Sequence, residues 1–216
     1  MQPKESHDDR EKRRLMVFEQ LRQRGITDSK VLEVMGRLPR QHFIPPENRQ
    51  QAYLDQPVSI GLGQTISQPY IVGLMTEKLE LRSGSRVLEI GTGCGYQTSI
   101  LAMLAGKVCT IELLESLAQF GRDSVGSLGI TNVEYHIGDG SLGWPTQTSF
   151  DRILVAAAAT EIPQKLLAQL CDDGKMVIPV GGGDGQRLLL VTKGADRIKE
   201  TMLCYCRFVK LVQPAQ

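Results

Sequence analysis

Three glycines alternate with other residues directly after a short apolar run, at Gly91, Gly93 and Gly95. The apolar run, 86–90, predicts a buried strand, and residues 96–104 have the apolar spacing of a helix. A strand, a glycine turn and a helix form the first unit of a nucleotide-binding α/β sheet. Glycine lets a ligand approach the main chain, and the helix start presents free N–H groups. A tight turn without a ligand is the alternative.

The spacing of these glycines separates two classes of cofactor. The dinucleotide fingerprint is G-x-G-x-x-G, and here the third glycine comes one residue early. Glu89, two residues before Gly91, also differs from the apolar residue that is usual at this position of the dinucleotide fingerprint. The pattern E-x-G-x-G-x-G resembles motif I of the S-adenosylmethionine-dependent methyltransferases, which implies S-adenosylmethionine as the ligand. An NAD-dependent oxidoreductase is the disfavoured alternative.

The composition indicates an ordinary soluble domain of 216 residues, with 41% hydrophobic and 23% charged residues. The formal net charge is +1 and no basic patch with interleaved aromatic residues is seen, so we expect neither nucleic acid nor a membrane as partner. Five cysteines without metal-ligand spacing favour free thiols and no metal site. Without a signal peptide or a membrane-length apolar run, a cytoplasmic protein is expected.

Strands and helices alternate along most of the chain. We expect a disordered tail at 1–9 and one domain over 10–216, in which helices and loops of 10–80 cover a sheet formed by 81–216. The alternation predicts a doubly wound, mostly parallel α/β sheet. The last two strands lack a helix between them, which predicts an antiparallel edge with a turn at 194–196. The seven predicted strands are 86–90, 108–112, 133–137, 150–156, 175–179, 188–192 and 201–212.

Carboxylates stand at two of the strand ends where such a sheet binds its ligand. Glu112 follows the glycine turn by about 20 residues, a spacing at which a carboxylate accepts hydrogen bonds from the two hydroxyls of a ribose. Asp139, between Gly138 and Gly140, can reach an adenine amino group. A solvated carboxylate at Glu112 and an Asx-turn at Asp139 remain open as alternatives.

A polar segment before the sheet leads into another predicted helix, which runs from Pro69 to about Leu79. Ser67 is placed to cap this helix, and Pro69 suits its first turn. From spacing alone, the cap is the favoured role for Ser67.

Several segments together resemble the protein-L-isoaspartate O-methyltransferase family, and they span most of the chain. The most specific of them is G-Q-T-I-S-Q-P-Y at 63–70, because the glycine turn is common to many methyltransferases. The resemblance implies a Rossmann-like methyltransferase fold, and we expect a monomer. The matching segments are 39–43, 52–55, 63–70, 87–101, 138–140, 161–163 and 177–181.

The resemblance also implies the reaction and its residues. A methyl group would pass from S-adenosylmethionine to the α-carboxylate of an isoaspartyl residue in a damaged protein or peptide, which then closes to a succinimide. Ser67 would be the catalytic residue that orients this carboxylate. No general base is needed, because an α-carboxylate is already ionised at neutral pH. The implied cofactor-binding residues are Gln64, Thr65, Ile66, Glu89, Gly91, Thr92, Gly93, Cys94, Gly95, Glu112, Leu113, Gly138, Asp139 and Gly140.

The chain departs from the family pattern at three places. Cys94 stands where the family often has serine, and 157–160 stands where it commonly has a proline-containing loop. Lys210 takes the proline position of R-F-V-P-L in a tail that helps line the substrate site, which leaves peptide preference open. Two further alternatives are a methyltransferase that acts on a small molecule and a methyltransferase-like binding module without activity.

Overall fold

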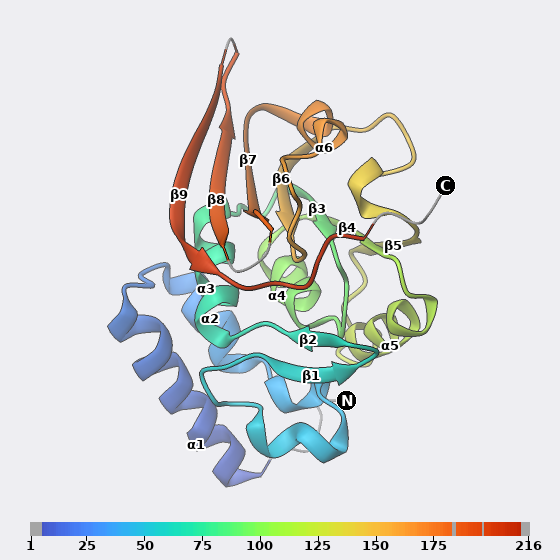
Figure 1. Cartoon of the computed structure of the whole chain (residues 1–216). Helices are drawn as coiled ribbons and strands as arrows, with labels where there is room; N and C mark the ends of the chain where they lie inside the picture. Colours follow the sequence, from blue (N-terminus) through green and yellow to red (C-terminus); the bar gives the residue numbers. More distant parts are fainter. Residues whose placement is uncertain (1–5, 183–184, 196, 213–216) are drawn as a thin grey trace.

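Seven strands form one sheet in the part of the chain that the computed structural model describes, residues 6–182, 185–195 and 197–212. Their order across the sheet is β5-β4-β3-β6-β7-β8-β9 (Figure 1). The strands are β3 (Arg86–Ile90), β4 (Lys107–Glu112), β5 (Val133–Ile137), β6 (Phe150–Val155), β7 (Leu170–Val180), β8 (Gln186–Lys193) and β9 (Ile198–Cys206).

Strands β3 to β7 are parallel to their neighbours in this part of the sheet. Strand β8 is antiparallel to both β7 and β9. The predicted doubly wound, mostly parallel sheet with an antiparallel edge is therefore confirmed. The turn expected at 194–196 lies between β8 and β9, where Gly194 N–H donates to the Arg197 carbonyl at 2.8 Å. Asp196 is outside the described residues.

Helices α4 to α6 connect strands of the sheet, and α1 to α3 precede it in the chain. They are α1 (His7–Leu15), α2 (Ser29–Arg37), α3 (Pro69–Leu79), α4 (Tyr96–Leu104), α5 (Glu115–Gly126) and α6 (Gln164–Gln169). Shorter helical turns are Met16–Leu21, Arg22–Arg24, Arg40–Phe43, Pro46–Gln51 and Gly140–Leu142. Within the described residues, none of the helices combines the length and apolar character needed to cross a bilayer.

Successive residues of the parallel strands enter two separate cores, because they point to opposite faces of the sheet. On β3, Val87 joins the core that contains residues of α2, α3, α4 and α5. Leu88 and Ile90 join the other core, which contains Leu166 and Leu167 of α6. A strand buried on both faces is apolar along nearly its whole length. This explains why the apolar runs of the sequence predicted these strands well.

The prediction of a disordered tail at 1–9 is wrong for residues 6–9, because α1 already begins at His7. The Ser6 hydroxyl oxygen accepts a hydrogen bond from Asp9 N–H at 3.0 Å and caps the helix. The rest of the predicted tail lies outside the described residues. The acidic first turn also suits the positive end of the helix dipole.

The segment between the second helix and the sheet contains a hairpin that the sequence analysis did not predict. It consists of β1 (Val58–Gly61) and β2 (Gln64–Ile66), which pair antiparallel and lead directly into α3. Both strands are too short for an alternating pattern to stand out in the sequence. The hairpin brings the family-specific segment to the glycine turn.

The last predicted strand, 201–212, is too long at its end, because β9 stops at Cys206. Beyond β9, the buried side chain of Gln186 takes the place of a neighbouring strand and hydrogen-bonds the backbone of Phe208. Its Nε2 donates to the Phe208 carbonyl at 3.0 Å, and its Oε1 accepts from Phe208 N–H at 2.6 Å. The chain beyond β9 therefore leaves the sheet and crosses its carboxyl-end edge as a tail.

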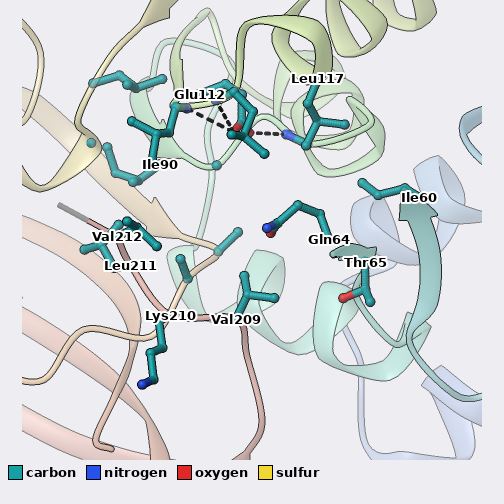
Figure 2. A pocket seen from close by; sticks show the side chains of 18 of the residues that line it. Ile60, Gln64, Thr65, Ile90, Glu112, Leu117, Val209, Lys210, Leu211 and Val212 are labelled. Atoms are coloured by element: carbon teal, nitrogen blue, oxygen red, sulfur yellow. Dashed lines mark hydrogen bonds between the residues drawn. The ribbon is translucent and has the colours of Figure 1, made fainter. Parts of the chain in front are cut away.

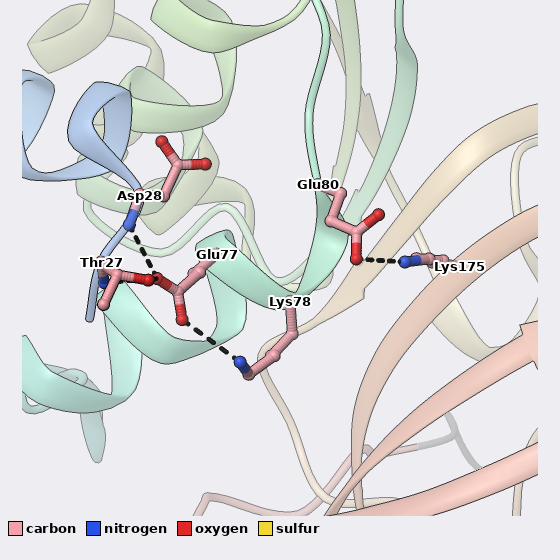
Figure 3. Close-up of polar contacts among 6 residues, drawn as sticks. All are labelled: Thr27, Asp28, Glu77, Lys78, Glu80 and Lys175. Atoms are coloured by element: carbon pink, nitrogen blue, oxygen red, sulfur yellow. Dashed lines mark hydrogen bonds and ion pairs between the residues drawn. The ribbon is translucent and has the colours of Figure 1, made fainter. Parts of the chain in front are cut away.

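One carboxylate ties the start of α2 to α3 (Figure 3). Glu77 Oε1 accepts from Thr27 N–H at 2.6 Å and from Asp28 N–H at 2.9 Å. Its other oxygen, Oε2, accepts from Lys78 Nζ at 3.2 Å. Burial raises the pKa of Glu77, but the hydrogen bonds from Asp28, Thr27 and Lys78 lower it more, so the net pKa is below its ordinary value. Ionised Glu77 thus stabilises the fold.

We predict that Glu77→Gln costs about 1–2 kcal/mol of unfolding free energy at pH 7, because two backbone donors lose a charged acceptor. A carboxyl with a lowered pKa contributes stability above its unfolded pKa of about 4.3 and loses it at lower pH. The difference between wild type and variant should therefore shrink below about pH 4. Urea unfolding at pH 7 and pH 3.5 (about one unit below the unfolded value) measures this.

Glu33→Gln is the matched control for this prediction, because Glu33 lies exposed on α2 and its ion pair within the described part of the chain is the exposed one with Arg37. It should change the unfolding free energy by less than about 0.5 kcal/mol. Equal effects of the two substitutions would contradict a stabilising role for Glu77.

Candidate functional site

A cavity lies beside the glycine turn, at the carboxyl ends of β3 and β4 (Figure 2). We call it the glycine-turn cavity. Figure 2 shows Gln64 and Thr65 of β2 on one side, Val209 and Leu211 of the tail on another, and Glu112 on a third. The structure thus brings together segments that are far apart in the sequence. The predicted site residues that line the cavity are Gln64, Thr65, Ser67, Gly91, Gly93, Glu112, Leu113, Gly138 and Gly140.

The glycines of the turn serve two purposes. Gly91 and Gly93 have φ values of 95° and 54° and line the cavity, so the main chain is open to a ligand there. Gly95 is not among the lining residues. A Cβ at Gly95 would lie 2.7 Å from the carbonyl oxygen of Gly121 in α5. Gly95 therefore allows the turn to pack directly on α5.

Three backbone N–H groups hold the Glu112 carboxylate at the cavity wall. Oε2 accepts from Gly93 at 2.9 Å, and Oε1 accepts from Leu113 at 2.9 Å and from Leu114 at 3.1 Å. The alternative of a freely solvated carboxylate is wrong, because Glu112 is only 7% exposed. A carboxylate has about four acceptor positions, so capacity remains for a ligand hydroxyl. Glu112 therefore fixes the turn and also faces the cavity.

Glu89 lies behind the turn and does not line the cavity. Its Oε2 accepts from the hydroxyls of Thr98 at 2.6 Å and Thr110 at 2.7 Å, and the Thr92 hydroxyl lies 2.7 Å from that of Thr110. Complete burial raises the pKa of Glu89 to about 8, although the two hydroxyls lower it. The carboxyl is therefore neutral at pH 7. Through these hydroxyls, Glu89 of β3 connects to Thr98 of α4 and Thr110 of β4, and Thr110 connects to Thr92 of the turn.

The other predicted cofactor residues also lie outside the cavity lining. Asp139 Oδ1 accepts from Ser141 N–H at 2.8 Å, so the alternative of an Asx-turn is confirmed. Ile66 and Cys94 are buried in the core on the α2–α5 face of the sheet. Thr92 is buried in the hydroxyl network around Glu89. These residues shape the cavity through the backbone that they hold in place.

Ser67 is not the cap of α3, contrary to the role that spacing favoured. The N-cap position belongs to Gln68, and no side chain caps this helix. Ser67 instead lines the glycine-turn cavity and a second cavity, which we call the tail cavity. The residues that line both cavities are Thr65, Ser67, Ala156 and Val209. Ser67 therefore stands where the two cavities meet.

Most lining residues that the sequence analysis missed are apolar. Ile90 and Ile111 come from the ends of β3 and β4, so their strand-end position was a usable signal. The tail gave a weaker signal. It reaches the site because Ala158 N–H donates to the Val209 carbonyl and Leu211 N–H donates to the Ala158 carbonyl, each at 2.8 Å. The family resemblance had already placed the tail with Val209, Lys210 and Leu211 beside the substrate site. The other lining residues beyond the predicted ones are Ile60, Ile90, Ile111, Leu114, Leu117, Ala156, Ala157 and Val212.

The residues of the glycine-turn cavity fit S-adenosylmethionine. Ile90, Ile111 and Leu117 offer apolar walls for a flat adenine, and Glu112 offers acceptor oxygens for hydroxyls. The main chain at Gly91 and Gly93 is open to close approach. Among the described residues, no group of three or more His, Cys, Asp or Glu side chains is arranged to hold a metal ion.

We predict that Glu89→Gln makes stability less dependent on pH. A carboxyl whose folded pKa is raised to about 8 stabilises the fold fully below its unfolded pKa, and this contribution falls as pH rises toward 8. The variant cannot ionise, so relative to wild type it should gain about 1–3 kcal/mol between pH 5 and pH 8. Urea unfolding across this range measures the difference.

Glu80→Gln serves as the control with the opposite sign (Figure 3). The hydrogen bond from Lys175 lowers the pKa of Glu80, so this carboxylate stabilises the fold at neutral pH and loses its effect in acid. A Glu89→Gln variant whose stability followed the wild-type pH curve would contradict a buried neutral carboxyl.

Comparisons with known proteins place the chain in a family. The family model of Protein-L-isoaspartate(D-aspartate) O-methyltransferase (PCMT) matches residues 11–216. A protein-L-isoaspartate O-methyltransferase of Myxococcus xanthus is 51% identical over 177 residues, which cover 82% of this chain and 84% of the relative. One of Methanoculleus marisnigri is 46% identical over 203 residues, with coverages of 94% and 92%.

Solved structures agree with this relationship. A Plasmodium falciparum protein of the same description, in complex with S-adenosyl-L-homocysteine, has a TM-score of 0.79 and 29% identity, covering 91% of this chain and 96% of that protein. A second protein-L-isoaspartate O-methyltransferase, 24% identical, has a TM-score of 0.81 and supports the fold, with coverages of 93% and 66%. The chain therefore belongs to the protein-L-isoaspartate(D-aspartate) O-methyltransferase family and is an S-adenosylmethionine-dependent methyltransferase.

Proposed function

We propose that this enzyme methylates the α-carboxylate of L-isoaspartyl residues in damaged proteins and peptides, and that Ser67 orients this carboxylate. The product ester closes to a succinimide, which begins the repair. One observation supports the assignment most directly: Ser67 lines both the glycine-turn cavity and the tail cavity. A residue at this junction can touch a substrate in one cavity beside a methyl donor in the other.

For this reaction, the protein mainly has to orient the substrate carboxylate toward the methyl group. The substrate α-carboxylate has an ordinary pKa of about 3.5, so the nucleophile is charged at neutral pH without a general base. The Ser67 hydroxyl donates a hydrogen bond to one carboxylate oxygen, which leaves the other oxygen to attack the methyl group. Apolar neighbours in the tail cavity, such as Ile71 and Phe208, displace water from the nucleophile. Orientation and desolvation supply the rate enhancement.

The glycine-turn cavity supplies the methyl donor when S-adenosylmethionine is bound. Glu112 would accept hydrogen bonds from its ribose hydroxyls. The turn at Gly91 and Gly93 borders the methionine part, with Glu89 supporting it from behind. Asp139 does not line the cavity and its Oδ1 forms the turn with Ser141, so only its Oδ2 would be available to the adenine amino group. The remaining predicted cofactor residues hold the main chain around these groups.

The wider biological setting follows from the proposed reaction. Isoaspartyl-containing proteins and peptides are the partners, and the enzyme acts on them as a cytoplasmic monomer with one methyltransferase domain, which includes α1 from His7. The near-neutral net charge of +1 supports partners other than nucleic acid or an anionic membrane.

We predict that the enzyme methylates an isoaspartyl peptide and leaves the matched aspartyl peptide unmodified. The two peptides have the same composition and charge, and they differ only in which carboxylate is free. Transfer of a labelled methyl group from S-adenosylmethionine measures the reaction. Equal methylation of both peptides would contradict the proposed specificity, and cofactor binding without any transfer would identify a binding module instead.

We also predict that Ser67→Ala lowers kcat for the isoaspartyl peptide about 10- to 100-fold, because the carboxylate loses its orienting donor. The dissociation constant of S-adenosylhomocysteine should change less than about threefold, since the hydroxyl serves the substrate side. Steady-state kinetics and calorimetry measure the two quantities.

Ser29→Ala provides the control, because Ser29 is exposed on α2 and lines neither cavity. It should retain the wild-type kcat. Intact turnover in Ser67→Ala would remove Ser67 from the proposed mechanism.

A further inference from the structure

The guanidinium of Arg40 is buried directly behind the segment that carries Ser67. Arg40 begins the helical turn Arg40–Phe43 and has no exposed surface. Its Nη2 donates to the Ser67 carbonyl at 2.7 Å, and its Nε donates to the Ala52 carbonyl at 2.7 Å. Arg40 lines neither the glycine-turn cavity nor the tail cavity. It therefore contacts the site only through other residues.

The same guanidinium also touches the cofactor side of the site. Its Cζ lies 5.0 Å from the ring centroid of Tyr96, the first residue of α4 after the glycine turn. Tyr96 is buried, and Phe43 packs edge-on against its ring at 5.3 Å between centroids. A guanidinium is attracted to the face of an aromatic ring at such distances. Arg40 thus joins the Ser67 segment to the helix that follows the glycine turn.

Burying this cation is unfavourable by itself. Among the described residues, no Asp or Glu forms an ion pair with Arg40. Desolvation lowers its pKa, although the guanidinium stays charged at neutral pH. Loop anchoring alone does not require a buried charge, because apolar side chains stabilise cores at lower desolvation cost. A rigid guanidinium does supply several donors in a fixed geometry.

The Ser67 peptide has few other restraints on its position. Strand β2 ends at Ile66, and α3 begins at Pro69, which has no N–H group. Gln68 between them caps α3 without a side-chain hydrogen bond. The helix holds Gln68, whose carbonyl accepts from Val72 N–H at 3.1 Å, and the bond from Arg40 to the Ser67 carbonyl restrains the residue before it.

We propose that Arg40 is a positioning residue for methyl transfer: it fixes the Ser67 segment relative to the glycine turn. This inference rests on the proposed role of Ser67. Through its two contacts, Arg40 sets how far the serine hydroxyl stands from the cofactor side of the site. Methyl transfer depends on this distance, whereas binding of the cofactor alone does not.

A second buried arginine provides a matched control at the other end of α3. The Arg152 side chain donates to the carbonyls of Leu79 and Asp151, and the residue is 9% exposed. It lines neither the glycine-turn cavity nor the tail cavity. Arg40 and Arg152 therefore share burial and carbonyl partners, but only Arg40 contacts the Ser67 segment.

The experiment compares Arg40→Lys with Arg152→Lys in the full chain. We expect both variants to lose stability in urea unfolding, since each loses part of a buried hydrogen-bond fork. Only Arg40→Lys should lower kcat for the isoaspartyl peptide, by about tenfold or more, with the S-adenosylhomocysteine dissociation constant within about threefold of wild type. Arg152→Lys should keep kcat within about twofold.

A double variant separates positioning from general damage. If Arg40 acts through Ser67, adding Arg40→Lys to Ser67→Ala should lower kcat no further than Ser67→Ala does alone. If Arg40→Lys does not fold, Arg40→Gln replaces it in the experiment, because glutamine places no charge in the buried position. It should show the same loss of kcat with retained cofactor affinity.

Two results would overturn the inference. One is an equal loss of kcat in Arg40→Lys and Arg152→Lys, and the other is a multiplicative loss in the double variant. Either result leaves the proposed function intact if wild type methylates the isoaspartyl peptide. A wild-type enzyme that binds S-adenosylhomocysteine but leaves this peptide unmodified would overturn the proposed function, and the positioning role with it.

Discussion

Direct contact between the backbones of the glycine turn and α5 sets the geometry on which the site depends. A Cβ at Gly95 would meet the Gly121 carbonyl oxygen, and a Cβ at Gly121 would lie 2.6 Å from the Gly93 carbonyl oxygen. Neither position accepts a larger residue without movement of main chain. Because the turn sits this close to α5, Gly93 N–H reaches Glu112 at the end of β4. The cavity wall follows from that contact.

Two buried ionisable side chains, Glu89 and Arg40, stabilise the backbone around the site. One of them is neutral and the other is charged. Glu89 is neutral at pH 7 and accepts hydrogen bonds from threonine hydroxyls below the turn. Arg40 stays charged and holds the carbonyls of Ser67 and Ala52. Neither side chain lines the glycine-turn cavity. A reaction whose nucleophile is already ionised needs accurate placement more than proton transfer, and both groups serve placement.

The sequence predicted the parts of the fold that depend on local pattern. Strand β3, the turn and α4 were found because burial on both faces gives an apolar run and a tight turn needs glycine. Other parts depend on contacts between distant residues and leave no local pattern. Examples are the tail held by Gln186, the buried position of Glu89, and the missing cap role of Ser67. The family resemblance, and not spacing, directed attention to Ser67.

The tail gives the active site a wall of much lower stability than its floor. Strands β3 and β4 lie inside the sheet, whereas the tail from Phe208 to Leu211 is held by two hydrogen bonds to Gln186, two to Ala158, and the packing of Phe208 and Leu211 against the cores. Each such bond contributes only about 0.5–1.5 kcal/mol. Local opening of the tail therefore requires far less free energy than unfolding of the sheet. The wall that the tail contributes to the tail cavity therefore lies outside the hydrogen-bonded sheet, whereas the floor of the glycine-turn cavity is formed by the ends of its inner strands.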